Sequence, residues 1–506
     1  MPSELIANMF GQCVVCSATL QGVEAIPVSV EVSIGPGIPG FSIVGMPDVA
    51  VRESQERVKA AIRSCGFQMP HDKIVVNLAP SSLKKSGSGF DLPIAVALLM
   101  LTGQISQEIV KPHLWVGELS LDGFVRPVRG MLSYELCARN AGLGFVVPDD
   151  VPDVVDLPGL DLRRLSTLFG LRTKELKPAV CTAAQSEFSE KDYGAIIGHS
   201  MAKRALQIAA AGNHGVLLMG SPGSGKTMLA QTLPSILPPL TEQERLESAL
   251  IYSVVGEPSG ALMAGVRPFR SPHHSSSLAG LVGGGNPIRP GEISLAHNGV
   301  LFLDEIAEFS PRALQALRQP MESGCVSLVR ADNTFEMPSS FMLVAASNPC
   351  PCGYFGDPET PCTCSDTRIR QYQNRIGGPL LDRIDIHLDV WRTPPKDVMS
   401  CQASDINSAV MREGVMKARA FRKERLLQDV SLNENPDALT SVLASCHLSL
   451  QDTGLFEDMA ERAHLSGRGM KKVLSLARTI ADMEEECVVQ RQHLLEALSL
   501  RLRKTD

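Results

Sequence analysis

Eight consecutive residues have the composition needed to bind the phosphates of a nucleotide. The apolar strand predicted at Gly215–Gly220 leads into Gly220-Ser221-Pro222-Gly223-Ser224-Gly225-Lys226-Thr227, and a helical pattern follows. Glycines permit a tight turn whose backbone N–H groups face phosphate oxygens, and the helix N-terminus adds partial positive charge. In this pattern Lys226 reaches the β- and γ-phosphates and the Thr227 hydroxyl binds Mg²⁺. The motif and its strand–loop–helix context predict an ATP site that uses Mg²⁺, rather than an incidental glycine turn.

Two further apolar strands are predicted to deliver polar side chains to the same site. Val300–Leu303 runs into Asp304 and Glu305, and another apolar run ends at Asn348. Ligands of open α/β sheets bind at the carboxyl ends of the strands. Asp304 would hold Mg²⁺, directly or through water, and Glu305 would polarise the attacking water. Asn348 is predicted to lie between these acids and the γ-phosphate, although an Asn before Pro is also ordinary turn chemistry.

Four of the 13 cysteines form a close cluster, Cys350, Cys352, Cys362 and Cys364. Four thiolates bind Zn²⁺ tetrahedrally, and a structural zinc would close a Gly- and Pro-rich loop that has few apolar residues. The C-x-C spacing is tighter than the usual C-x2-C spacing. Ordinary reduced cysteines or two labile disulfides therefore remain alternatives.

A third group of residues could grip a polymer. Arg267, Arg270, His273 and His274 precede a serine run, and Arg289 follows a glycine-rich segment. Arginines on glycine-rich loops can follow a phosphate backbone, so these residues are candidates for DNA binding. The alternative is that the loops pack within the subunit.

Elements of a mixed α/β protein with several domains must position these groups. The pattern over 506 residues predicts an α/β domain at 1–170, a linker at 171–190, an α/β core at 191–395 and a helical domain at 396–506. The sequence has no apolar run long enough for a transmembrane helix and no recognisable secretory signal, so we expect a cytoplasmic protein without membrane contact. The net charge of −7 gives no global electrostatic case for nucleic acid. The net charge does not exclude nucleic acid either, because a ring-shaped enzyme that passes a strand through its centre would need positive charge only in that channel.

The chain resembles the AAA+ superfamily, in its magnesium-chelatase-like branch, and more closely the YifB/ComM family of bacterial competence proteins. The stretches that carry the closer resemblance are Arg267–Ser271 with Pro272-His273-His274, Pro290–Gly299, Asn348–Gly353 and Gly378–Asp385. The resemblance spans nearly the whole chain. It implies an AAA+ P-loop core with a C-terminal helical lid.

The resemblance also implies roles for two arginines. Arg383 would be an arginine finger that reaches into a neighbouring subunit's site, unless it forms a surface pair with Asp382 or Asp385. Arg468 matches the family's second sensor, an arginine of the lid that touches the γ-phosphate, and Arg478 is a weaker candidate for that role. A shared active site requires a ring, and the family suggests a homohexamer.

The first domain resembles the proteolytic domain of Lon proteases and the related domain of RadA recombination proteins. The matching stretches are Asn77–Pro80, Lys85–Asp91 and Gly117–Val128. The nucleophile position of that fold falls on Gly89, no lysine occurs from Met131 to Ala138, and Ser86 and Ser88 lie outside the pattern. We expect a retained fold that serves as a platform and has no peptidase activity.

The expected function is an ATP-hydrolysing ring motor that remodels DNA, as a helicase or branch-migration enzyme in recombination during natural transformation. Its expected partners are single-stranded or branched DNA, further copies of the chain and recombination proteins. The alternatives are a metal-chelatase motor subunit and a protein-remodelling ATPase. A chelatase would need a partner-binding segment that this sequence does not contain.

Overall fold

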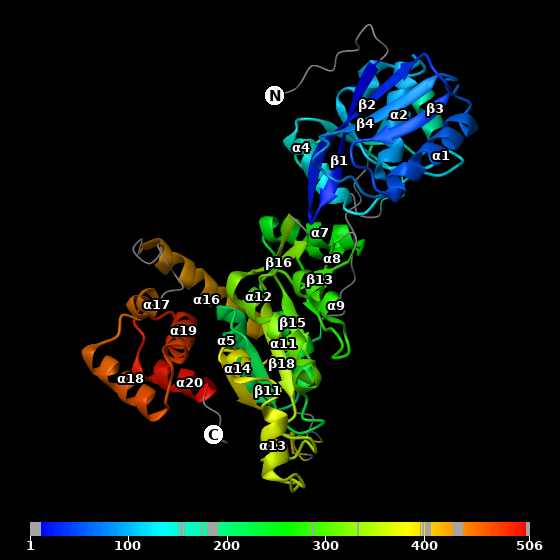
Figure 1. The fold of residues 1–506 in the computed structure, drawn as a ribbon. Helices are drawn as coiled ribbons and strands as arrows, with labels where there is room; N and C mark the ends of the chain where they lie inside the picture. Colours follow the sequence, from blue (N-terminus) through cyan, green and yellow to red (C-terminus); the bar gives the residue numbers. More distant parts are fainter. Residues whose placement is uncertain are drawn as a thin grey trace.

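The computed structural model describes residues 12–149, 151, 155, 157–173, 176–179, 191–285, 288–330, 333–394, 396, 399, 406–428 and 439–501. Figure 1 shows an N-terminal α/β unit in blue, a central α/β unit in green and yellow, and a group of helices in orange and red beside the central unit. The expected linker at 171–190 lies mostly outside the described residues, so its boundaries stay a prediction.

The N-terminal unit contains two four-stranded sheets and three main helices. The first sheet has the order β1-β2-β4-β3, with only the β3–β4 pair parallel. The second sheet has the order β10-β9-β8-β5. The strands are β1 (Gln12–Gln21), β2 (Glu24–Gly35), β3 (Gly40–Val44), β4 (Lys73–Ala79), β5 (His113–Trp115), β8 (Gly144–Val147), β9 (Leu162–Arg164) and β10 (Lys177–Pro178). The helices are α1 (Val49–Ser64), α2 (Asp91–Leu101) and α4 (Met131–Asn140). Nearly every side chain of α2 is buried, because this apolar helix packs against α1, β1 and β2.

The central unit is built on a five-stranded sheet with the order β12-β15-β18-β11-β19. All four strand pairs are parallel, so the carboxyl ends of the strands share one edge of the sheet. The strands are β11 (Val216–Met219), β12 (Phe269–Arg270), β15 (Val300–Leu303), β18 (Met342–Ser347) and β19 (Ile386–Asp389). Every residue of β11, β15 and β18 is buried, as expected for parallel strands covered on both faces.

Helices and two small hairpins surround this sheet. The helices are α5 (Ser200–Gly212), α6 (Lys226–Thr232), α7 (Glu242–Val255), α8 (Gly260–Met263), α9 (Leu278–Val282), α10 (Glu292–Leu295), α11 (Pro311–Ala316), α12 (Arg318–Ser323), α13 (Asp366–Gln373) and α14 (Gly378–Leu381). The hairpins are β13 (Gly283–Gly284) with β14 (Arg289–Pro290), and β16 (Cys325–Arg330) with β17 (Asn333–Pro338). Helix α7 begins with a capping box between Thr241 and Glu244, which satisfies backbone donors of its first turn.

The C-terminal helices pack on the central unit. They are α16 (Ser408–Gln428), α17 (Leu439–Cys446), α18 (Leu450–Arg462), α19 (Gly467–Met483) and α20 (Arg491–Arg501). Helix α19 contacts α5, α16, α17 and α20, and its buried residues join the hydrophobic core that includes alternate residues of β11 and β18. The described part of 396–506 contains helices and no strand.

The N-terminal unit meets the central unit mainly through α4 and α7. The backbone N–H of Gly130 donates to the Ser253 carbonyl at 2.9 Å, and that of Leu132 donates to the Ser253 hydroxyl at 3.2 Å. Leu132 and Ala249 lie in a small apolar cluster between the two helices. The first unit is therefore attached to the central unit by packing and hydrogen bonds as well as by the chain.

Candidate nucleotide-binding site

The predicted nucleotide residues meet at one edge of the central sheet. Gly220 follows β11, Asp304 follows β15, and Asn348 follows β18, and these three strands are adjacent and parallel. The carboxyl ends of the strands therefore bring together residues more than 100 positions apart in sequence. The sequence prediction rested on the same principle, that such edges bind ligands.

Lys226 lies at the centre of this cluster. Its Nζ donates to the carbonyl oxygens of Gly220 at 2.8 Å and Ser221 at 2.9 Å, and to Oδ1 of Asn348 at 3.3 Å. Burial lowers the pKa of the Lys226 ammonium, and the nearby charges of Asp304 and Glu305 oppose that shift. The lysine, the loop and the predicted sensor Asn348 are thus in direct contact.

The groups predicted to hold Mg²⁺ are paired with each other. Oγ1 of Thr227 donates to Oδ2 of Asp304 at 2.9 Å, which places a hydroxyl and a carboxylate side by side. Oxygen ligands of this kind suit Mg²⁺. The buried hydroxyl of Ser224 has no hydrogen-bond partner within the described residues, so the loop offers an unused polar group for a ligand. These residues fit ATP with Mg²⁺, which would supply charge neutralisation at the phosphates when bound.

Glu305 adopts a backbone conformation that is unusual for a residue with a side chain. Its φ is 50° and its ψ is 49°, in the left-handed region. Such conformations cost free energy and cluster at functional sites. Oε2 of Glu305 lies 4.0 Å from Nδ1 of His274, and the rings of His273 and His274 are tilted at 35° to each other with centroids 4.1 Å apart. His274, predicted to contact DNA, therefore lies beside the predicted catalytic glutamate.

The glycine loop is shaped by close contacts that the sequence motif does not reveal. A Cβ at Gly220 would lie 2.0 Å from the carbonyl oxygen of Val390, so only glycine fits there. Gly223 and Gly225 have φ values of 77° and 85°, which glycine adopts readily. Arg392 donates through Nε and Nη2 to the Pro222 carbonyl at 3.1 and 2.9 Å. We did not identify Arg392 from the sequence, because its only local signal is its place shortly after the last strand.

His199 is a second residue that the sequence reasoning missed. Its Nε2 lies 3.0 Å from Oγ1 of Thr393, and a Cβ at Gly225 would lie 3.5 Å from the same nitrogen. His199 precedes α5 and has a left-handed φ of 56°. Glycine and histidine before a helix are a weak signal, and only the fold shows that they border the phosphate loop.

The four clustered cysteines lie within ligand distance of one another. Sγ of Cys350 is 3.3 Å from Sγ of Cys352 and 3.7 Å from Sγ of Cys362, and all four sulfur atoms lie within 4.8 Å of one another. Tetrahedral Zn–S bonds of about 2.3 Å require sulfur atoms roughly 3.8 Å apart. All four are free thiols here, so the disulfide alternative is not the arrangement that the structure contains. The geometry is compatible with zinc.

The cysteine loop also touches the glycine loop. A Cβ at Gly353 would lie 2.5 Å from Cδ of Pro222. The guanidinium of Arg392, which holds the Pro222 carbonyl, lies 5.4 Å from the ring centre of Tyr354. The cysteine loop thus packs on the phosphate loop directly through Gly353, and Tyr354 contacts the arginine that holds Pro222.

Comparisons with known proteins agree with this arrangement. Three family profiles match the chain. The profile described as magnesium chelatase, subunit ChlI, matches residues 192–398. The profile of subunit ChlI of Mg-chelatase matches residues 30–151, and that of the ChlI C-terminal region matches residues 405–501. YifB of Escherichia coli is 40% identical over 95% of both chains. The competence protein ComM of Haemophilus influenzae is 38% identical over 96% of this chain and 97% of its own. The chain belongs to the YifB/ComM family of magnesium-chelatase-like AAA+ proteins.

Membership of the YifB/ComM family supports the interpretation of the site as that of an ATPase. The similarity to true chelatase components is narrower. The magnesium-chelatase 67 kDa subunit of Chlorobaculum tepidum is 29% identical over 30% of this chain and 23% of that protein. Among the described residues, no helix combines the length and the apolar character needed to cross a membrane.

The two arginines that the family resemblance singled out lie together, away from the phosphate loop. Glu322 accepts from Arg383 at 2.7 Å and from Arg468 at 2.9 Å. Arg383 thus pairs with Glu322, whereas the sequence alternative paired it with Asp382 or Asp385. Arg383 precedes β19, whereas Gly220 follows β11, and β11 and β19 are parallel neighbours. Arg383 therefore lies at the opposite edge of the sheet from Lys226.

Arg478, the weaker candidate for the second sensor, is a structural residue. Its side chain is buried, and it donates to the Asp482 carboxylate at 3.1 Å and to the Cys487 carbonyl at 2.8 Å. Its position on α19 points the guanidinium at the turn before α20, so Arg478 does not face solvent.

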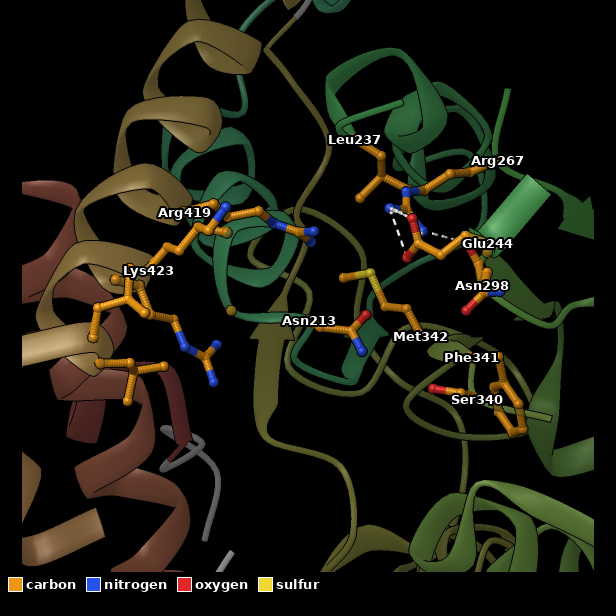
Figure 2. Close-up of a pocket in the computed structure, with 16 residues that line it drawn as sticks. Asn213, Leu237, Glu244, Arg267, Asn298, Ser340, Phe341, Met342, Arg419 and Lys423 are labelled. Atoms are coloured by element: carbon orange, nitrogen blue, oxygen red, sulfur yellow. Dashed lines mark hydrogen bonds and ion pairs between the residues drawn. The ribbon is translucent and has the colours of Figure 1, made fainter. Parts of the chain in front are cut away.

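The expectation that Arg267 and Arg270 lie on open, DNA-gripping loops needs correction. Arg267 is paired with Glu244 at 3.0 Å and donates to the Asn298 carbonyl at 2.6 Å, and its side chain is only 10% exposed. Figure 2 shows this pair as dashed lines. Arg270 binds the carboxylates of Glu257 at 2.8 Å and Glu292 at 2.7 Å. These contacts match the alternative of loops packed within the subunit, because carboxylates distant in sequence neutralise both arginines.

Arg289 differs from these two arginines, because it is exposed on the β13–β14 hairpin. It borders a cavity of about 1270 Å³ between the N-terminal unit and the central unit. Arg52, Lys84 and Arg129 line the same cavity. Of the arginines predicted to bind DNA, only Arg289 keeps an exposed position.

Residues around the nucleophile position of the Lon-like pattern have structural partners in the N-terminal unit. The buried Lys85 ammonium donates to the Pro80 carbonyl, and the Ser88 hydroxyl donates to the Glu118 carboxylate. A Cβ at Gly89 would lie 3.1 Å from Val116. The described geometry gives no serine paired with a lysine, since each of the two groups has another partner.

Proposed function

We propose that this protein hydrolyses ATP and uses the energy to remodel DNA. The observation that carries the proposal is the convergence of Lys226, Thr227, Asp304 and Asn348 at one edge of a parallel sheet, in a chain of the YifB/ComM family. Lys226 and the loop amides would hold the phosphates, and Thr227 with Asp304 would hold Mg²⁺. Glu305 would accept a proton from the attacking water and orient it toward the γ-phosphate.

We propose further that each active site is completed by a neighbouring copy of the chain. Arg383 and Arg468 share Glu322 at the edge of the sheet opposite the phosphate loop. An arginine at that edge cannot approach the phosphates of its own subunit without crossing the sheet. In a head-to-tail ring the same edge would face the next subunit's loop, where Arg383 would neutralise charge on the transferring phosphoryl group. A homohexamer is the ring that the family resemblance suggests.

DNA is the proposed substrate because ComM, a relative that is 38% identical over 97% of its own length, is a competence protein. The proposed reaction is strand separation or branch migration during recombination of incoming DNA. The exposed Arg289 and the basic residues Arg52, Lys84 and Arg129 around the inter-unit cavity are the candidate phosphate contacts. This assignment replaces Arg267 and Arg270, whose charges are neutralised inside the subunit.

The decisive experiment measures ATP hydrolysis with and without three- and four-strand DNA junctions, together with the conversion of labelled junctions to products. The wild-type chain is expected to hydrolyse ATP faster with junction DNA and to resolve the junctions, whereas Lys226→Ala should do neither. Arg289→Gln should weaken DNA binding and reduce its log–log salt slope by about 0.7. If folded protein hydrolyses ATP but neither binds DNA at low salt nor acts on any junction, the DNA assignment fails and a protein-remodelling role replaces it.

We also propose that Cys350, Cys352, Cys362 and Cys364 hold one structural Zn²⁺. The support is the mutual approach of four sulfur atoms in a loop that packs on the phosphate loop through Gly353. A zinc ion at this point would fix the side of the nucleotide site that Pro222 forms. The metal would be structural, because four protein ligands leave no open position for a substrate.

A further inference from the structure

A cavity lies between the long helix α16 and the central sheet, on the side away from the nucleotide site. Its volume is about 540 Å³. The sheet side of its wall comes from residues just before or at the start of three strands, namely Asn213, Gly299 and Met342. The phosphate loop follows the carboxyl end of β11, so β11 separates the two sites by its four residues, or about 13 Å.

One face of α16 lines the cavity with positive charge. Arg419, Arg422 and Lys423 border it, and their spacing of three and four residues places them on one side of the helix. Figure 2 shows Arg419 and Lys423 on one side of the cavity and Arg267 with Glu244 on the other. Glu244 is the only acidic residue among those that line the cavity, and Arg267 already binds both of its carboxylate oxygens.

The positive charge around this cavity is not compensated within the described residues that form its wall. Nη2 of Arg419 donates to the Ala210 carbonyl at 2.7 Å, but its buried Nε has no hydrogen-bond partner. Burial, and after it the positive charge of Arg267, lowers the pKa of the Arg419 guanidinium to about 10. Three cations of one helix that border a cavity whose one carboxylate is already bound by Arg267 leave a site where an anion would be stabilised.

The remaining wall combines amide and hydroxyl groups with apolar surface. Asn213 and Ser340 contribute polar groups, while Leu237, Phe341 and Met342 contribute apolar surface. Cavities of roughly 300–1,000 Å³ with apolar walls and a few converging polar groups are typical sites for small ligands. A ligand with a phosphate and a flat ring would suit this cavity, because the phosphate could bind the cations of α16 and the ring could pack on the apolar side chains.

We propose that this cavity is a second binding site, separate from the phosphate loop, for a nucleotide phosphate. The ligand is either a free mononucleotide or one nucleotide of a DNA strand, since both present a phosphate beside a flat ring. Arg422 and Lys423 contact the phosphate from the solvent side, and Arg419 contacts it from within. This proposal does not depend on an activity toward DNA, because a free nucleotide could make the same contacts with the cavity.

The experiment separates this site from the phosphate loop by using Lys226→Ala as the background, in which binding at the loop is removed. Full-length protein is titrated in parallel with fluorescent AMP and with a 5′-labelled ten-residue oligothymidylate. Arg422→Gln with Lys423→Gln should weaken at least one of these probes by about tenfold or more. The substitutions are on exposed side chains, so the fold should be retained. Lys417→Gln is the matched control, because Lys417 is exposed on α16, pairs with Glu413 and does not line the cavity.

The two probes distinguish the two sources of the phosphate. Loss of AMP binding assigns the cavity to a free nucleotide, and loss of oligonucleotide binding alone assigns it to a strand. Either result supports the site, provided that Lys417→Gln binds like its background. Equal affinity of the double variant and the background for both probes would overturn the proposal, as would an equal loss in Lys417→Gln. Loss of the DNA-stimulated ATPase in an otherwise wild-type chain is a different outcome and bears only on the proposed function.

Discussion

At the scale of single residues, the nucleotide site is organised by contacts that join three strands. Lys226 contacts its own loop and also Asn348, and Thr227 contacts Asp304. The Lys226–Asn348 and Thr227–Asp304 contacts each connect segments that are far apart in sequence. The chemistry therefore depends on the sheet as well as on the motif, and substitutions should separate binding from turnover.

We expect Lys226→Ala to abolish ATP binding and Glu305→Gln to bind ATP but hydrolyse it very slowly. In the proposed mechanism the lysine contacts the phosphates, whereas the glutamate acts on the attacking water, so its loss would leave the phosphate contacts intact. Equilibrium binding of a fluorescent ATP analogue and steady-state phosphate release measure the two effects. Lys417→Ala, an exposed lysine on α16, is the control and should change neither. Wild-type turnover in Glu305→Gln would remove Glu305 from the catalytic role.

Residue types alone could predict the loop, the two acids and Asn348, because each follows an apolar strand at a recognisable position. The same reasoning could not place Arg267 or Arg270. Their partners Glu244, Glu257 and Glu292 become neighbours only after folding, and an arginine that binds a carboxylate looks the same in sequence as one that binds phosphate. Arg392 was missed for the same reason, since its contact with Pro222 spans 170 residues.

At the scale of elements, Arg267 joins the start of α7 to the loop before β15. We expect Arg267→Gln to lower the free energy of unfolding by about 3 kcal/mol, because it leaves a half-buried Glu244 without its partner. Urea unfolding followed by circular dichroism measures the change. Arg289→Gln is the control and should unfold like the wild-type protein, since Arg289 is exposed. If Arg267→Gln had unchanged stability but lost affinity for DNA, Arg267 would be assigned to DNA binding after all.

The cysteine loop is the second element with a testable role. We expect about one zinc per chain in protein purified without chelator, and none in Cys352→Ser with Cys362→Ser. Because the loop packs on Pro222, loss of the metal should also weaken ATP binding several-fold. Elemental analysis and nucleotide titration measure the two effects, and Cys487→Ser, an exposed cysteine outside the cluster, is the control. Zinc-free wild-type protein with normal ATP affinity would leave these residues as plain thiols.

Sequence periodicity predicted the elements better than their packing. The apolar runs around β11, β15 and β18 are short and continuous, as buried parallel strands require, and the C-terminal region reads as helical throughout. The sequence could not show that α19 brings Arg468 to Glu322 or that Arg478 is buried, because both depend on how the helices pack. The Lon-like character of the first unit stays a prediction from resemblance.

At the scale of the whole molecule, the location of Arg383 predicts cooperation between copies of the chain. If Arg383 acts at a neighbour's site as proposed, Arg383→Ala should lower turnover by roughly 10³-fold while ATP binding is retained. Arg375→Ala is the control, since Arg375 is exposed, forms an ion pair with Glu308 and lies over the Tyr372 ring. Mixing Arg383→Ala with Lys226→Ala should restore part of the activity, because one hybrid interface has both groups intact. A mixture that forms rings but stays inactive would contradict action between subunits.

The parallel sheet gives each subunit two different edges, with the phosphate loop at one and Arg383 at the other. In the proposed ring, contacts between such edges would be heterologous, so neighbouring subunits would be related by rotation about the ring axis and not by a twofold axis. A subunit damaged at both edges would therefore silence two active sites, its own and one neighbour's. In a cell that carries one normal and one doubly defective copy of the gene, most rings would contain several silent sites. Such an allele would be dominant, and its effect would grow with the number of subunits that must act in sequence.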